Sequence, residues 1–294
     1  MQTDALLHLN LNRRGGLSRR NFLQSAALGI GGSSLLSQFR LHAEDLKKEG
    51  RSCILLWLAG APSQMETWDP KPGTPNGGET KKIQTQSPGV EIAHYWPKIA
   101  AAMNEIAVIR AMTGKEAAHE RGTYHLHTGH RMLGIEKFPH FGSVVARELG
   151  DPQSDIPNFV SIGQTLSSGF LGVQVAPFII DRPGQLPDNV VNSTSDLRQR
   201  RRLALLSQQE AEFAKAGATE LVKEQSELYQ KANLMMTSPR LKAFQFDDEP
   251  AAMQEAYGKS QTGQGLLVAR RLVEAGVPFV EVRSTGWDMH SSVF

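Results

Sequence analysis

The sequence predicts an α/β protein built on a mostly parallel sheet. Short apolar runs bounded by turn residues occur four times, at 53–59, 106–110, 158–162 and 277–283. Runs of this kind are typical of strands in parallel sheets. Helical patterns separate these runs along the chain, and strands that alternate with helices favour parallel connections.

The first run, 53–59, is continuously apolar and ends at Gly60, so we expect a strand buried on both faces with Cys53 in the core. Ser63 and Glu66 have the spacing of a capping box and predict a helical turn. The next stretch, 69–91, is rich in Pro, Gly, Thr and Gln and predicts a long surface loop.

The later elements follow from periodicity and from glycine stops. Helices are expected at 99–103, at 119–131 with its end at Gly129, at 141–149, and at 263–274. Residues 195–236 have one long helical stripe and predict a helical insert. The arginine cluster near its start is either a solvated helix face or a binding patch; it comprises Arg198, Arg200, Arg201 and Arg202.

The N-terminal region predicts export. Ser18-Arg19-Arg20-Asn21-Phe22-Leu23 precedes a weakly apolar run at 25–36, with a cleavage site at 41–43. This pattern is typical of a twin-arginine signal, which makes the twin-arginine translocation machinery a partner and the periplasm or cell envelope the destination. We therefore divide the chain into a signal at 1–43 and a domain at 44–294. The alternative to a signal is a short amphipathic helix, which the glycines disfavour. The apolar run is also too short and too rich in glycine to form a stable membrane span.

Most of the basic character belongs to this signal. It contains five of the 32 basic and one of the 30 acidic residues, so 27 basic and 29 acidic residues remain after it. A net charge near −2 gives no support to nucleic-acid binding. Cys53 is the single cysteine, so no internal disulfide can form.

Ligands of α/β sheets bind at the carboxyl ends of the strands, and three predicted strands are followed there by polar residues. They are Ser63, Glu66 and Asp69 after the first strand, Thr113, His119 and Glu120 after the second, and Asp288 and His290 after the last.

Asp288-Met289-His290 is the most specific of these groups. Alternate residues of an extended segment face the same side, so a carboxylate and an imidazole could hold one divalent metal. The alternative is a polar strand end with an Asp–His hydrogen bond. Five histidines also cluster between 119 and 140, which fits either metal or anion chemistry or an ordinary surface.

Two predicted helix starts could bind an anion through free N–H groups. One begins at His119 and the other at Ser63, where a capping box without any ligand is the simpler interpretation.

Three ordered motifs carry a family resemblance: Leu58 to Pro72, His119 to Arg131, and Gly286-Trp287-Asp288-Met289-His290. With the export signal, they make residues 50–294 similar to domain-of-unknown-function family 1501. That family resembles the alkaline phosphatase and sulfatase superfamily. The resemblance implies a mostly parallel central sheet with helices on both faces and a metal-dependent hydrolase ancestry.

The resemblance also implies roles for individual residues. Asp288 and His290 would bind a divalent metal (zinc, calcium or similar) with help from Glu66 or Asp69. His119 would be the catalytic nucleophile or base. The residues near an anionic small molecule or glycan substrate would be Ser63, Thr123, His127 and Arg131. The chain departs from the superfamily in two places: Ala59-Gly60 stand where a metal-binding Asp is usual, and His119 stands where sulfatases carry a modified Cys.

Three functions therefore stay open. The first is an exported metal-dependent hydrolase acting on phosphate or sulfate esters. The second is a non-catalytic binding protein for a sulfated glycan or an envelope partner. The third is an inactive fragment, because the family continues beyond the last motif and this chain stops four residues after His290.

Overall fold

The computed structural model describes residues 45–46, 49–110, 112–188, 190–191 and 194–291, so the predicted export signal lies outside the described residues. The chain divides into two units, 1–48 and 49–294, and the second contains the sheet. The sheet has four strands in the order β1 (Cys53–Leu58), β6 (Phe279–Ser284), β4 (Phe159–Ile162) and β5 (Phe178–Ile180). Every neighbouring pair is parallel, which confirms the α/β class and the parallel sheet.

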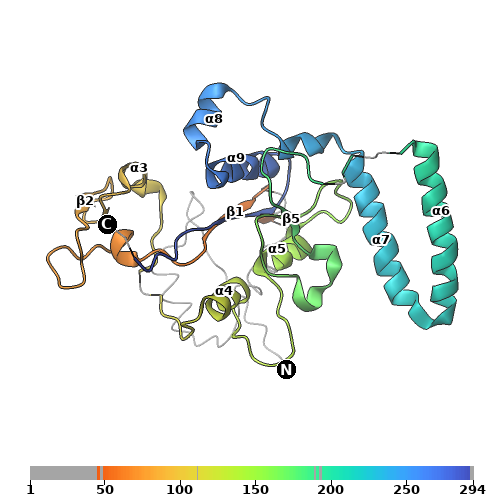
Figure 1. Ribbon diagram of the computed structural model, residues 1–294, viewed down its shortest axis with the longest axis horizontal. Coiled ribbons are helices and arrows are strands. Elements are labelled where there is room, and N and C mark those ends of the chain that lie inside the picture. Colours follow the sequence, from red (N-terminus) through yellow and green to blue (C-terminus); the bar gives the residue numbers. More distant parts are fainter. Residues whose placement is uncertain (1–44, 47–48, 111, 189, 192–193, 292–294) are drawn as a thin grey trace. The chain divides into compact units, whose positions relative to one another are not determined.

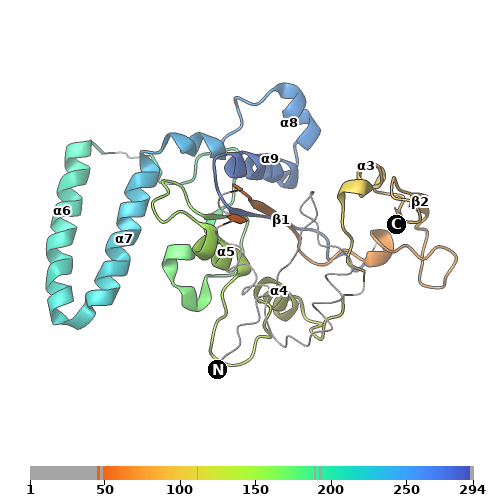
Figure 2. The same cartoon turned by 180° about the vertical axis from the view of Figure 1, so that it is seen from behind.

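Helices cover both faces of this sheet. The side chains of β6 alternate, so Val280 and Val282 pack in the cluster with α9 (Gln261–Glu274), while Phe279 packs in the cluster with α5 (Phe141–Leu149). Figures 1 and 2 show α9 along one face, and α5 with α4 (His119–Thr128) along the other.

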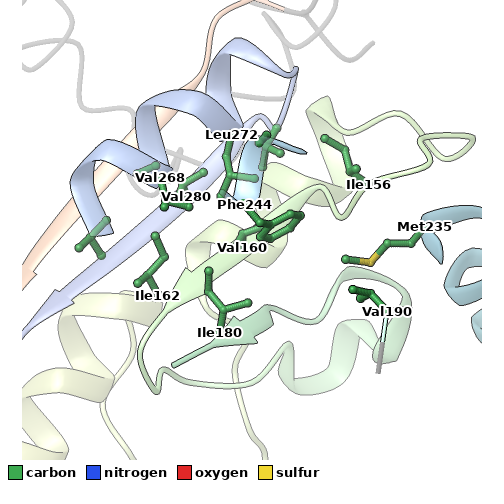
Figure 3. Packing of buried hydrophobic residues seen from close by; sticks show 14 residues of the cluster. Ile156, Val160, Ile162, Ile180, Val190, Met235, Phe244, Val268, Leu272 and Val280 are labelled. Carbon is green, nitrogen blue, oxygen red and sulfur yellow. The ribbon is translucent and has the colours of Figure 1, made fainter. Parts of the chain in front are cut away.

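The main core lies between α9 and the sheet. Val268 and Leu272 of α9 meet Val160 and Val280 of the strands, and Phe244 closes the cluster (Figure 3). All five side chains are completely buried, so this contact supplies much of the hydrophobic stabilisation of the sheet.

The expectation that the first strand is buried on both faces is wrong. Among the described residues, β1 is the edge strand of the sheet and pairs only with β6. Ile54 and Leu56 are 39% and 42% exposed, and Cys53 is exposed rather than a core residue. A continuous apolar run predicts a strand, but it does not predict whether the strand lies at the centre or at the edge of its sheet.

The second predicted strand, 106–110, is also wrong. Ile106 and Val108 instead pack against a small separate cluster, which contains Ile92, Ala100 and Met103. This cluster is built by α3 (Pro97–Ala101), η2 (Met103–Glu105) and an antiparallel hairpin of β2 (Lys82–Gln84) and β3 (Glu91–Ala93). The hairpin falls partly in the stretch predicted as a loop, because three-residue strands leave little periodicity.

The other predicted helices are present. α4 ends at Gly129, which has the left-handed conformation usual after a helix (φ 73°), and the Ser63 side chain caps η1 (Gln64–Glu66). The stretch 195–236 forms two helices, α6 (Asp196–Phe213) and α7 (Thr219–Met236), which lie side by side in Figure 1. Gly217, with φ 105°, breaks the helix within η5 (Ala214–Ala218). The remaining short elements are η3 (Gly169–Leu171), η4 (Val173–Val175), η6 (Pro239–Phe244) and α8 (Ala251–Tyr257).

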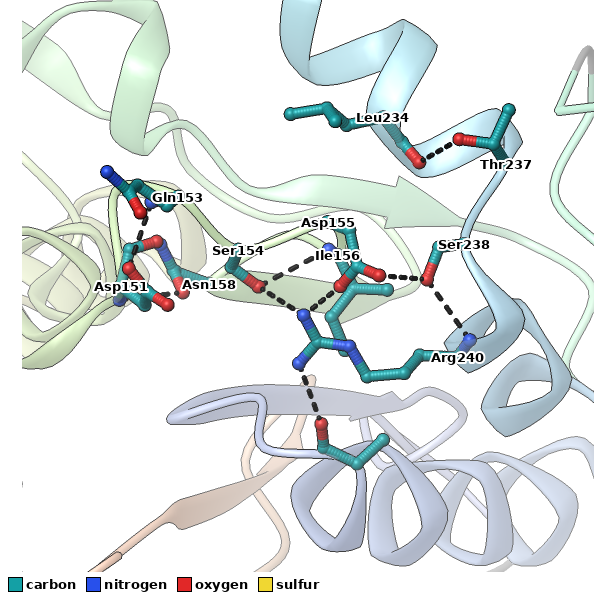
Figure 4. A network of polar contacts seen from close by, with 11 residues as sticks. Asp151, Gln153, Ser154, Asp155, Ile156, Asn158, Leu234, Thr237, Ser238 and Arg240 are labelled. Carbon is teal, nitrogen blue, oxygen red and sulfur yellow. Dashed lines mark hydrogen bonds and ion pairs between the residues drawn. The ribbon is translucent and has the colours of Figure 1, made fainter.

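A polar network holds η6 against the segment before β4 and the end of α9 (Figure 4). The Arg240 guanidinium pairs with Asp155 and donates to the carbonyl oxygen of Ala275 at 3.2 Å. Ser238, which caps η6, donates to the same aspartate at 2.7 Å. The network joins the segment before β4 to the end of α9. Within the described part of the chain, no helix is long and apolar enough to cross a bilayer.

Candidate metal centre

The pairing of β1 with β6 places two loops together at one edge of the sheet. Leu58 lies opposite Ser284, so both strands end at the same level. A Cβ atom on Gly60 would lie only 2.5 Å from the backbone nitrogen of Asp288. The absence of a side chain at Gly60 therefore allows the loop after β6 to approach the loop after β1.

The backbone is strained at the same point. Ala61 has φ 62°, and it is the one non-glycine residue with positive φ in the part of the chain that the structure describes. Such a conformation costs an L-residue about 1 to 2 kcal/mol. Strain of this kind clusters at functional sites, where the surrounding structure holds it in place.

Three of the predicted site residues meet here. Asp288 Oδ2 lies 3.2 Å from His119 Nε2, and Asp288 Oδ1 lies 2.9 Å from His290 Nε2. The side chains are 60% exposed for His119, 46% for Asp288 and 84% for His290. His119 comes from the start of α4, and the other two come from the loop after β6.

These separations fit the coordination shell of one metal ion. Ligand atoms about 2.0 Å from a tetrahedral zinc lie about 3.3 Å from one another. The nitrogen–oxygen distances of 3.2 and 2.9 Å are close to that value, and the three ligand atoms all lie within 4.8 Å of one another. The cluster therefore offers two imidazoles and a carboxylate to a metal.

A pocket of about 720 Å³ adjoins the cluster. Its lining includes Asp288 and His290 together with two other predicted residues, Ser63 and Glu66. The Ser63 hydroxyl accepts a hydrogen bond from Met65 N at 3.2 Å, so it serves as a helix cap in this pocket wall. A second pocket, of about 380 Å³ and mostly apolar, lies between η4 and α7 and is lined by none of the predicted site residues.

The start of α4 adds hydrogen-bond donors to the site. Its first intrahelical bond runs from Gly122 N to the Ala118 carbonyl oxygen at 2.8 Å, and Ala118 provides no side-chain cap. The N–H groups of the first turn before Gly122 therefore have no acceptor within the helix, which is the arrangement that favours an anion.

Other predicted residues lie apart from the pocket lining. Asp69 accepts from Lys71 Nζ at 2.7 Å, and Arg131 pairs with Glu116 at 2.6 Å. Thr123 supplies its backbone oxygen to His127.

His127, predicted beside the substrate, belongs to a second group, which is buried. Its Nε2 lies 3.2 Å from Glu281 Oε1, and both side chains are at most 2% exposed. His140 Nε2 lies 3.0 Å from Glu281 Oε2 without an aligned hydrogen bond, and Thr165 Oγ1 donates to that same oxygen at 2.7 Å. The ligand atoms of His127, His140 and Glu281 are near enough to one another to hold a metal. The positions of the protons on the two rings distinguish a metal site from an ion pair.

The hydrogen bonds at the far side of each ring assign those protons. His140 Nδ1 accepts from Gly142 N at 2.8 Å, so the proton of this ring is on Nε2, which cannot then ligate a metal. His127 Nδ1 donates to the Thr123 carbonyl at 2.8 Å. Two lone pairs would repel across the 3.2 Å contact with Glu281, so one proton lies between the two atoms; because the pKa of the Glu281 carboxyl is lowered to about 2, that proton belongs to His127 Nε2. The buried group is therefore an ion pair.

The electrostatics agree with this assignment. Burial by itself raises the pKa of the Glu281 carboxyl, but its contacts with His127, His140 and Thr165 outweigh burial and lower the pKa to about 2. Burial lowers the pKa of His140, which keeps that ring neutral.

Sequence reasoning assigned no role to Glu281. The signal that could have found it is a single carboxylate in an otherwise apolar strand, Phe279-Val280-Glu281-Val282. A buried acid is rare unless it is paired, so its position within the strand itself predicts a partner.

Comparison with known proteins adds a family to this geometry. No curated protein and no solved structure matches the chain. The model of one protein family, described as a protein of unknown function (DUF1501), matches residues 50–294. This match covers the sheet and all three residues of the exposed cluster, and the chain therefore belongs to the DUF1501 family.

Proposed function

We propose that the chain is an exported, metal-dependent hydrolase that acts on phosphate or sulfate esters. The observation that carries the proposal is the convergence of His119, Asp288 and His290 beside a pocket at the carboxyl edge of the sheet. The finer fold assignment, an alkaline phosphatase or sulfatase-like arrangement, belongs to the same proposal and is supported by the parallel sheet.

In this proposal, His119, Asp288 and His290 hold a divalent metal, and Glu66 lies in the same pocket wall. A bound metal supplies Lewis-acid activation of water and of the ester. Three protein ligands are the number that leaves a position open for substrate, as in catalytic zinc sites. Two imidazoles and one carboxylate suit zinc better than calcium, which prefers oxygen ligands.

The protein itself addresses the anionic group of the substrate. The N–H groups of the first turn of α4, which have no acceptor within the helix, lie on the same segment as His119, so an ester anion near the metal would also be within the influence of the helix dipole. With His119 as a metal ligand, no protein nucleophile is needed. In this proposal the chain therefore requires no Cys, Ser or Thr at that position.

The test compares the wild-type chain with Asp288→Asn. Metal content is measured by mass spectrometry after dialysis, and turnover is measured with p-nitrophenyl phosphate and p-nitrophenyl sulfate. We expect bound metal and hydrolysis in the wild type, and a loss of about 100-fold in metal affinity in the variant. The control is Asp247→Asn, which removes an exposed carboxylate outside the pocket. A wild type without metal, or a variant with unchanged turnover, contradicts the proposal.

A non-catalytic binding protein is the second candidate. It is favoured by the end of β1, where Ala59-Gly60 provide no carboxylate for a second metal. Binding of a sulfated glycan with no turnover of either ester would support this candidate, and metal-dependent turnover would exclude it.

A further inference from the structure

Four segments meet on the buried Glu281 carboxylate. Glu281 lies in β6, His127 in α4, His140 at the cap of α5, and Thr165 after β4. Glu281, His127 and His140 are at most 2% exposed. Removal or displacement of one partner of a buried ion pair leaves an uncompensated charge, which is strongly destabilising. The elements that carry these side chains can therefore move little relative to one another.

The same two elements lead to the exposed metal cluster. His119 and His127 are both on α4, and their eight-residue spacing corresponds to about 12 Å along a helix. Glu281 is in β6, and Asp288 is in the loop that follows this strand. α4 therefore contacts the segment 281–288 at two levels, one buried and one exposed.

We propose that His127 and Glu281 are positioning residues, which fix α4 on β6 and thereby hold His119 within reach of Asp288. This inference rests on the proposed metal site.

The ion pair can fix the position of α4 on β6 because its hydrogen bonds are directional. An apolar contact would allow α4 to slide along the strand. The His127 ring has three contacts: Nδ1 with the Thr123 carbonyl, Nε2 with Glu281, and a T-shaped contact with Trp57, whose ring centroid lies 4.3 Å away. Metal–ligand distances tolerate about 0.2 Å, so a small shift of α4 would move His119 out of a shared coordination shell.

Three variants separate positioning from general stability. His127→Gln keeps a donor but leaves the Glu281 charge without a counter-charge. Glu281→Gln is the conservative match: its amide can donate to a neutral His127 while its oxygen accepts from Thr165. Val268→Ala opens a cavity between α9 and the opposite face of the sheet. It lowers the stability of the fold without removing any contact of His127 or Glu281.

Two quantities are measured for each variant alongside the thermal midpoint. They are zinc affinity, by competition with a chromophoric chelator, and amide hydrogen exchange of the segment 119–128. We expect His127→Gln to weaken zinc binding at least tenfold and to accelerate exchange in 119–128 at least tenfold. We expect Glu281→Gln to change both by less than about threefold, and Val268→Ala to leave zinc affinity within twofold.

The proposal is overturned if His127→Gln changes zinc affinity and exchange in 119–128 no more than Val268→Ala does. It is also overturned if Glu281→Gln loses as much as His127→Gln, because the contacts would then not be those assigned. If the wild type binds no zinc, the proposed function fails, and exchange in 119–128 alone decides the positioning role. If His127→Gln does not fold, Thr165→Val, which removes one donor to Glu281, is measured in its place.

Discussion

Gly60 offers the sharpest test of how the metal cluster is assembled. In Gly60→Ala the new Cβ would lie 2.5 Å from Asp288 N and 2.8 Å from Asp288 Cβ. Ordinary contact begins at 3.4 Å, so the loop after β6 must move by about 0.9 Å. That displacement exceeds the tolerance of about 0.2 Å in a metal–ligand distance. We therefore expect zinc affinity to fall by at least tenfold.

A matched control is available for the backbone strain. Gly217 has φ 105°, almost identical to the 104° of Gly60, and a Cβ there would meet nothing within 4 Å. Both alanine variants should lose about 1 to 2 kcal/mol of stability from the positive φ, measured by urea denaturation. Only Gly60→Ala should lose zinc in a chelator competition. Equal zinc affinity in the two variants would refute the argument that Gly60 sets the place of Asp288.

Three further outcomes follow from the core and the buried ion pair. The Glu281 carboxyl should titrate near pH 2 rather than 4.5 in ¹³C NMR. Because the carboxyl has a lower pKa in the folded state than in the unfolded chain, it contributes about 3 kcal/mol to the free energy of unfolding. This contribution is complete above pH 4.5 and is lost as the pH falls towards 2. A titration midpoint near 4.5 would contradict the prediction. Leu272→Ala should cost about 2 to 5 kcal/mol in urea denaturation and leave zinc binding unchanged, since Leu272 is fully buried in α9; a cost below 1 kcal/mol would contradict that packing. Gly142→Ala would place a Cβ 2.5 Å from the Phe279 ring and should lower stability by about 1 to 3 kcal/mol in the same assay, whereas a neutral effect would show that the ring moves freely.

The parts of the fold that could be predicted are those with long local patterns. Helices α4, α5 and α9 have glycines near their ends, and β6 is a long apolar run before a turn. The three-residue strand β5 was missed, since three residues hold less than two periods of alternation. The run 106–110 was predicted as a strand because a short apolar run can belong either to a sheet or to the small separate cluster in which Ile106 and Val108 pack.

The candidate site could be predicted from the sequence only in part, and for a different reason. The spacing of Asp288 and His290 is local, so their common side was predictable. His119 was expected at the end of a strand that does not exist, yet it reaches the cluster through the start of α4. Glu281 left no local signal beyond its own charge, because its partners lie 116 to 154 residues away along the chain. Such contacts depend on how the helices are seated on the sheet, which periodicity does not encode.

The contrast between the two polar groups bears on function. Both join α4 to β6 or its following loop, and both contain two histidines and one carboxylate. In the buried group the side chains of His127, His140 and Glu281 are at most 2% exposed, so the group can stabilise an arrangement but is closed to a substrate. The exposed group has a His290 side chain that is 84% exposed and adjoins a pocket. Structural zinc sites are closed by four protein ligands, whereas a site with three ligands facing a pocket has room for another molecule. This difference favours chemistry or ligand binding at His119, Asp288 and His290, and a positioning role at His127 and Glu281.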